Sequence, residues 1–236
     1  MMPFRICLRR LIVFILMVWI SGMVGAARAT QVIFKTSLGN FRASLFDAAA
    51  PITVKNFLKY VDEADYDQTI IHRSVKDFVI QSGGFKIDFS PIPADPPIIN
   101  ESSLPNIRGT LSMATRSGDP NSATSQWFIN LVNNSPLLDL QNGGFTVFGE
   151  IVPTDMSVVD AIAALPKIDA RSIHPALSEL PLLVPFVPGQ GPNDLKLVVV
   201  NSIDRVPEPH GLLLMFAAMP ASACLRAARW KVCASS

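Results

Sequence analysis

The sequence predicts a mainly β domain whose short strands form an antiparallel barrel rather than a parallel sheet. Short apolar runs bounded by Gly, Pro, Asn and Asp recur along the chain. Only two stretches have the periodicity of an amphipathic helix, and strands do not alternate with helices as they do in a parallel sheet. The 236 residues are enough for one domain with its own core once two atypical ends are set aside.

The first predicted elements are a β-hairpin and a helix. Residues 32–37 and 41–46 are joined at Gly39-Asn40, two residues that tolerate the positive φ of a tight turn. Pro51 marks the start of the helix, because proline is favoured in a first helical turn. One apolar stripe of this helix is formed by Val54, Phe57, Leu58 and Val61.

Residues 69–85, TIIHRSVKDFVIQSGGF, contain two apolar runs separated by a polar turn and closed by two glycines. Alternation along the second run places Val79 and Gln81 on one face, with Phe78 at the mouth of the site. Arg73 then stands over an apolar floor beside one amide, which suits a neutral, partly polar ligand. The alternative is an ordinary edge strand with a solvated arginine.

The remaining elements are two proline-rich loops, four strands and a second helix. The loops are predicted at residues 89–107 and 167–194, and the strands at 110–113, 126–131, 145–152 and 195–200. Thr154 or Asp155 can cap the second helix. Its buried side is expected to carry Met156, Val159 and Ile162.

The N-terminal end, residues 1–29, has the features of a secretory signal peptide. Three arginines precede an uncharged apolar run at residues 11–24, which is followed by small residues. This run is shorter than the about 20 residues that a membrane span needs, so cleavage is expected before Thr30. An uncleaved anchor helix is the alternative.

The C-terminal end, residues 207–236, begins with Pro-Glu-Pro and continues with the apolar stretch 211–225 and a basic tail. This order resembles the C-terminal sorting signals that exosortases process in some Gram-negative bacteria. The basic tail favours a cytoplasmic end, which leaves the domain outside. Pro220 interrupts the apolar stretch, and a plain membrane anchor or a disordered tail are the alternatives.

The region between these ends, residues 30–206, is acidic and free of cysteine. It carries 13 Lys and Arg against 18 Asp and Glu, a formal charge of −5, which disfavours nucleic acid as a partner. Cys7, Cys224 and Cys233 all lie outside it, so no disulfide is expected within the domain. The three histidines are too widely spaced for a zinc site, and no metal or cofactor is expected.

A second block, residues 108–149, contains RGTLSMATRSGDPNSATSQWFINLVNNSPLLD followed by FTVFG. Together with residues 69–85 it resembles the cyclophilin family of peptidyl-prolyl isomerases, most closely the short-looped bacterial exported branch, from about Val32 to Val206. The resemblance implies a closed eight-stranded antiparallel β-barrel capped by two α-helices. It also places the active groove on the outer face, since side chains fill the interior of such a barrel.

The resemblance also implies roles for individual residues. Trp127 is assigned to the barrel interior. The catalytic set is Arg73, Phe78, Gln81, Gln126 and Phe128. The substrate-binding set is Val79, Ala114, Thr115, Leu137, Leu138 and Phe145. His72 beside Arg73 is the one tempting base, but a structural role is favoured because isomerisation needs no proton transfer.

Several positions depart from the better-known eukaryotic pattern. Val79 replaces methionine, Thr115 asparagine, Leu137 tryptophan and Phe145 histidine. Leu137 implies weak cyclosporin binding, because that tryptophan supplies a hydrogen bond to the drug. Lys76-Asp77 replaces the usual Pro-Gly turn and could shift Phe78.

The expected function is prolyl isomerisation in exported proteins, with proline-containing polypeptides as partners and the chain a monomer. Signal peptidase and exosortase are expected to act on it during export to the periplasm, outer surface or medium. The alternative is a weakly active module at the cell surface or matrix that binds proline-containing segments without turning them over.

Overall fold

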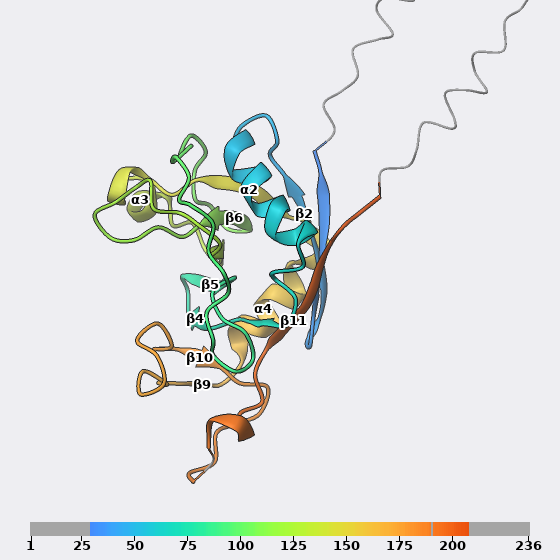
Figure 1. Ribbon diagram of the computed structural model, residues 1–236, viewed down its shortest axis with the longest axis vertical. Coiled ribbons are helices and arrows are strands. Elements are labelled where there is room, and N and C mark those ends of the chain that lie inside the picture. The colour runs from blue at the N-terminus through green and yellow to red at the C-terminus, as the bar shows by residue number, and fades with distance from the viewer. Residues whose placement is uncertain (1–28, 190, 208–236) are drawn as a thin grey trace, which may run out of the picture. The chain divides into compact units, whose positions relative to one another are not determined.

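A computed structural model of the chain describes residues 29–189 and 191–207 (Figure 1). Nearly all of both predicted end segments, 1–29 and 207–236, lies outside the described residues, and the domain boundaries at 30 and 206 stay a prediction. Within the described ranges, no helix is long and apolar enough to cross a bilayer. No group of three potential metal ligands occurs there either.

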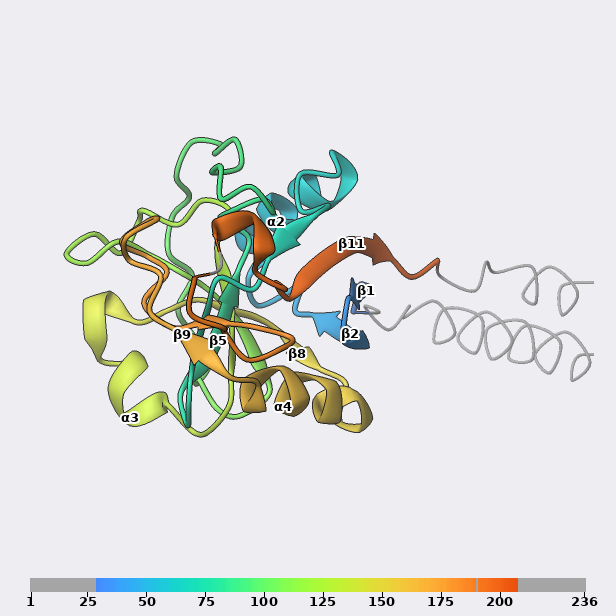
Figure 2. The same cartoon turned by 90° about the horizontal axis from the view of Figure 1, so that it is seen from below.

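The described chain folds into a curled antiparallel sheet with few helices (Figures 1 and 2). The nine strands of the sheet run in the order β3-β11-β1-β2-β8-β6-β7-β5-β4. Their bounds are β1 Gln31–Thr36, β2 Gly39–Leu45, β3 Thr69–Ile70, β4 Arg73–Val75, β5 Val79–Ser82, β6 Thr110–Met113, β7 Trp127–Asn130, β8 Val147–Ile151 and β11 Val199–Arg205. A separate pair consists of β9 (Lys167–Ile168) and β10 (Leu180–Pro181).

Within the described residues, three α-helices and three short 3-10 turns accompany the sheet. The helices are α2 (Pro51–Asp62), α3 (Ser135–Leu138) and α4 (Met156–Ala164). The 3-10 turns are η1 (Gln141–Gly143), η2 (Pro153–Asp155) and η3 (Pro192–Asp194). In both views α2 and α4 lie apart, and α2 contacts β11 whereas α4 contacts β2 (Figures 1 and 2).

The prediction of a closed eight-stranded barrel is wrong, because the sheet is an open half-barrel with β3 and β4 at its edges. These edge strands follow one another in sequence, but the chain changes partners between them. The Ile71 amide donates to the Val198 carbonyl at 2.9 Å, whereas the His72 amide donates to the Gln81 carbonyl at 3.1 Å. The two edges therefore do not pair with each other.

The predicted hairpin and the helix starting at Pro51 are confirmed. The predicted capping of α4 is wrong in its chemistry, although the helix starts where expected. The Asp155 side chain caps no helical amide and instead accepts from Arg42, with 2.8 Å between Arg42 Nε and Asp155 Oδ2. The Arg42 hydrogen bond lowers the pKa of Asp155 to about 2. An ion pair between β2 and η2, the turn just before α4, thus takes the place of the cap.

Two further differences concern the start of the closing strand and one additional helix. The closing strand starts at Val199 rather than residue 195, because residues before it pair with the loop instead, the Leu183 amide donating to the Lys196 carbonyl at 2.7 Å. Helix α3 was not predicted at all.

The core fills the hollow of the curled sheet with aromatic rings. Phe34 and Phe41 stack with ring centroids 4.6 Å apart, and Trp127 meets Phe34 edge-on at 5.1 Å. Trp127 is fully buried, as predicted for the interior. Because alternate residues of β7 point to opposite faces, burying Trp127 inside directs Phe128 to the outer face.

Gly83, which follows β5, packs against this core. Its φ is +75°, and an added Cβ would lie 2.7 Å from the Ser125 carbonyl oxygen and 2.9 Å from Trp127 Cδ1. Gly118 has a similar φ of +82° but no atom within 4 Å of an added Cβ.

Gly83→Ala should therefore lower the free energy of unfolding by about 3 kcal/mol, because overpacking adds to backbone strain. Gly118→Ala, the matched control, should lower it by about 1 kcal/mol through backbone strain alone. Urea denaturation of both variants measures the difference. Equal losses would contradict the close packing described around Gly83.

Candidate active site

Three neighbouring strands, β4, β5 and β7, present side chains to a cleft on the outer face of the sheet. Arg73 of β4 pairs with Gln81 of β5, and Gln81 pairs with Phe128 of β7. Residues directly opposite in an antiparallel ladder point to the same face. The register therefore brings these three side chains together around a cavity of about 270 Å³.

One side of the cleft is an apolar cup. Val79, Phe128 and Leu138 are buried together, and the partly buried Phe78, Ala114 and Phe145 pack against them. The Phe128 and Phe145 rings meet edge-on with centroids 5.7 Å apart. The cup offers aromatic and aliphatic surface for a compact apolar ring and leaves one side open.

The other side of the cleft is polar and centred on Arg73. Arg73 Nη1 donates to Gln81 Oε1 at 3.4 Å, and Gln81 Nε2 donates to Gln126 Oε1 at 2.9 Å. None of the ion pairs formed by the described residues involves Arg73. Two neutral amides in series thus hold the guanidinium in place without cancelling its charge.

Most of the predicted site residues come together in this cleft. Its lining includes Arg73, Phe78, Val79, Gln81, Ala114, Thr115, Phe128, Leu138 and Phe145. Gln126 stands one layer behind and lines an adjoining hollow of about 340 Å³ that shares Gln81, Ala114 and Thr115 with the cleft. Leu137 is 56% exposed and does not line the cleft.

Gln141 of η1 is a lining residue that the sequence did not reveal. It lies in an irregular stretch where neither alternation nor helical spacing indicates the direction of a side chain. Only a family motif that included position 141 could have identified Gln141 as a lining residue.

The unusual Lys76-Asp77 turn does not displace Phe78 from the cleft. Asp77 adopts φ 54°, in the left-handed region that glycine favours and that aspartate tolerates better than most residues. The Phe78 carbonyl accepts from the Leu131 amide and from Asn134 Nδ2, both at 2.9 Å. Phe78 therefore lines the cup as predicted.

His72 has no part in the cleft, which agrees with the structural role favoured above. It is buried, its ring meets Phe85 edge-on at 5.1 Å, and neither ring nitrogen has a hydrogen-bond partner among the described residues. Burial, with smaller contributions from Arg73 and His174, lowers the pKa of His72 to about 3. The imidazole is therefore neutral at physiological pH.

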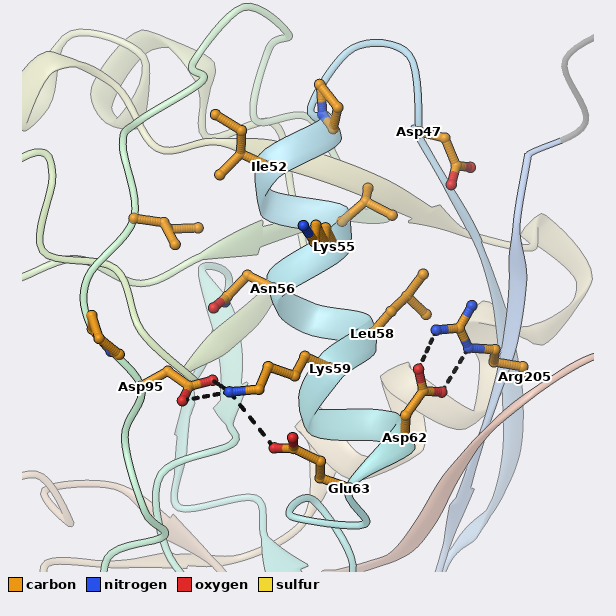
Figure 3. Close-up of a pocket in the computed structure, with 14 residues that line it drawn as sticks. Asp47, Ile52, Lys55, Asn56, Leu58, Lys59, Asp62, Glu63, Asp95 and Arg205 are labelled. Atoms are coloured by element: carbon orange, nitrogen blue, oxygen red, sulfur yellow. Dashed lines mark hydrogen bonds and ion pairs between the residues drawn. The ribbon is translucent and has the colours of Figure 1, made fainter.

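A larger hollow of about 780 Å³ runs along α2, away from every predicted site residue (Figure 3). Figure 3 shows Lys59 directed towards Asp95 and Arg205 directed towards Asp62. Lys59 Nζ lies 2.7 Å from Asp95 Oδ2, and Arg205 Nε donates to Asp62 Oδ1 at 2.7 Å. These charges are paired with one another and the lining holds no aromatic side chain, so the smaller cleft is the better candidate for chemistry.

Comparison with known proteins gives one consistent result. The family model described as cyclophilin type peptidyl-prolyl cis-trans isomerase/CLD matches residues 31–177. The chain is 43% identical over 153 residues to a peptidyl-prolyl cis-trans isomerase of Acinetobacter baylyi, covering 62% of this chain and 80% of that protein. It is 46% identical over 138 residues to peptidyl-prolyl cis-trans isomerase B of Escherichia coli, covering 56% and 83%.

The fold is also similar to a solved structure. A Cryptosporidium parvum cyclophilin type peptidyl-prolyl cis-trans isomerase, crystallised in the presence of the dipeptide Ala-Pro, superposes with a TM-score of 0.57. The match covers 75% of this chain and 99% of that one at 24% identity. At this identity the likeness concerns the fold alone.

The buried neutral His72 should make stability depend on pH. Unfolded His72 takes up a proton below about pH 6.5, whereas folded His72 does so only near pH 3. Its contribution to stability is therefore complete above pH 6.5 and is lost as pH falls towards 3. We expect the free energy of unfolding to fall more steeply in the wild type than in His72→Gln between pH 6.5 and 4, by up to about 1.4 kcal/mol per pH unit.

Chemical denaturation at several pH values measures both slopes. Parallel slopes for the two proteins would contradict a buried neutral imidazole.

Proposed function

This chain belongs to the cyclophilin-type peptidyl-prolyl cis-trans isomerase family, and we propose that the Arg73 cleft is the place where it catalyses rotation about X-Pro bonds. The reaction itself follows from the family and from relatives at 42–46% identity. The observation that supports the location is a guanidinium without a carboxylate partner, held by amides over an apolar cup.

The reaction makes and breaks no covalent bond. Partial double-bond character gives the peptide C–N bond a rotation barrier of about 18–20 kcal/mol, and X-Pro isomerisation without a catalyst takes tens to hundreds of seconds. A catalyst needs only to bind the twisted amide better than either planar form. Each 1.4 kcal/mol or so of that preference increases the rate about tenfold.

Arg73 supplies this preference. In the twisted amide the proline nitrogen becomes pyramidal and regains a lone pair, which the planar amide lacks. A guanidinium N–H directed at that nitrogen therefore stabilises the transition state more than the ground state. The hydrogen bond from Arg73 to Gln81 uses one donor of the fork and leaves others for the substrate.

The cup holds the proline ring while the preceding carbonyl turns. Phe78, Phe128 and Leu138 contact the ring, with Val79 beneath them and Phe145 at the rim. Ala114 and Thr115 run beside the peptide, while Gln81 and Gln126 support Arg73 or contact the peptide backbone. The substrates are proline-containing polypeptides, and this chemistry requires no metal or cofactor.

Arg73→Ala should lower kcat for an Ala-Pro peptide by about a hundredfold, the usual loss when a transition-state donor is removed. The kcat of Arg73→Lys should lie between those of the wild type and Arg73→Ala, because lysine keeps the charge without the planar fork. A protease-coupled isomerisation assay measures both. Arg171→Ala is the matched control, since Arg171 pairs with Asp169 outside the cleft and its removal should leave kcat unchanged.

An Arg73→Ala variant as active as the wild type would contradict the assignment of Arg73. No acceleration by the wild type itself would favour a proline-peptide-binding module instead.

We also propose that the isomerase works outside the cytoplasm on exported proteins, as a monomer. The supporting observations are the signal-like residues 1–29 and the Pro-Glu-Pro segment 207–236. Slow cis-trans isomerisation of X-Pro bonds can limit the folding rate of exported chains, and an isomerase outside the cytoplasm would accelerate this step. Leu137, exposed outside the cleft, is consistent with weak cyclosporin binding.

Mass spectrometry of the protein recovered from the expressing bacterium tests this proposal. We expect an N-terminus at Thr30, produced by signal peptidase, and no peptide containing Trp230 if an exosortase removes the segment 207–236. A retained Trp230 peptide would contradict sorting cleavage and favour a plain anchor. An intact N-terminus on the mature protein would contradict signal-peptide removal.

A further inference from the structure

We propose that Asn134 is a positioning residue that sets the geometry of the apolar cup through Phe78 and Leu138. The inference rests on the proposed function, because it assigns the cup to the proline ring. Asn134 is 7% exposed and is absent from the lining of the cleft. Its effect on the substrate is therefore indirect.

The side chain of Asn134 holds the turn that carries Phe78. Its Nδ2 donates to the Phe78 carbonyl at 2.9 Å and to Asn130 Oδ1 at 2.8 Å. Asn130 is fully buried, and its own Nδ2 donates to Thr110 Oγ1 at 2.8 Å. The Asn134 amide is thus fixed from behind by strand β7 and offers its donor to Phe78 in a defined direction.

The backbone of Asn134 starts the helix that carries Leu138. Its carbonyl accepts from the Leu138 amide at 2.8 Å and from the Leu137 amide at 3.0 Å. Its own amide donates to the Asn106 carbonyl at 2.9 Å. One residue therefore connects two sides of the cup, the Phe78 turn and helix α3.

Asn106 extends this network to the rim of the cup. Its Nδ2 donates to Asp139 Oδ1 at 2.8 Å and to the Phe145 carbonyl at 3.1 Å. Asn106 Oδ1 accepts from Ser112 Oγ at 2.8 Å. The backbone carbonyls of Phe78 and Phe145, two residues that line the cleft, thus both accept hydrogen bonds from buried asparagine side chains.

The local sequence explains why Phe78 depends on such a support. The turn before it contains Asp77 at φ 54°, a backbone conformation that residues other than glycine adopt less often. Within the turn the Phe78 amide reaches the Val75 carbonyl only at 3.2 Å. The bonds from Leu131 and Asn134 to the Phe78 carbonyl therefore fix where its ring stands.

Kinetics distinguish this positioning role from a purely structural one. The cup contacts the proline ring in the ground state and in the transition state alike, so a misplaced Phe78 weakens both equally and raises KM at constant kcat. Loss of folded protein would lower the apparent kcat and leave KM unchanged. Loss of Arg73 acts on kcat, because its contact forms in the transition state.

Asn134→Asp is the most direct test, because it keeps the shape but replaces the donor facing the Phe78 carbonyl with a carboxylate oxygen. We expect KM for an Ala-Pro peptide to rise about tenfold, with kcat within about twofold of the wild type. The matched control is Asn133→Asp next to it. Asn133 is exposed and acts only as an acceptor, from the Ser135 amide at 3.1 Å and the Ser135 hydroxyl, so KM should not change.

Two further variants keep the inference testable if Asn134→Asp does not fold. Asn134→Ala removes the same donor without adding a charge and should also raise KM. In a Phe78→Ala background the substitution at Asn134 should raise KM by less than about threefold, because the aromatic ring that Asn134 positions is no longer present.

The outcomes separate this inference from the proposed function. A wild type without isomerase activity overturns the proposed function. An active wild type overturns the inference about Asn134 if the substitutions leave KM unchanged or lower kcat alone. Full additivity with Phe78→Ala would also overturn it.

Discussion

The proposed mechanism depends on Arg73, a cation that has no carboxylate partner among the described residues and lies beside an apolar surface. A carboxylate beside this half-buried guanidinium would offset the charge that the proposed mechanism directs at the twisted amide. Here the hydrogen-bonded neighbours are neutral: Arg73 donates to Gln81, and Gln81 donates to Gln126. An acidic residue at position 81 would hold Arg73 more tightly and make it a weaker catalyst.

The fold supplies this arrangement through register and burial. Trp127 fills the interior, so its neighbour Phe128 must face outwards opposite Gln81. Two residues of the remaining walls, Phe78 and Phe145, lie outside the strands, and their backbone carbonyls accept hydrogen bonds from buried asparagine side chains. The strand pairing thus positions Arg73, while hydrogen bonds from buried asparagines position Phe78 and Phe145 of the cup.

Strand alternation placed Val79 and Gln81 on one face beside Arg73, whereas Phe128 was assigned to the same cleft only by the family resemblance; all four residues line the cleft. The sequence did not predict features decided by distant partners. Asp155 accepts a hydrogen bond from Arg42, which is far away in the chain, instead of capping the helix. The sheet stays open because the Ile71 and His72 amides pair with different strands. Helix α3 and Gln141 lie in a stretch too short and irregular for any periodicity.

A crystal structure of the domain with a bound peptide containing Ala-Pro tests the central claim most directly. The account predicts the proline ring against Phe78, Phe128 and Leu138, with an Arg73 guanidinium nitrogen within about 3.5 Å of the proline amide group and still hydrogen-bonded to Gln81. An Arg73 side chain turned into bulk water, with the ring bound elsewhere, would contradict it.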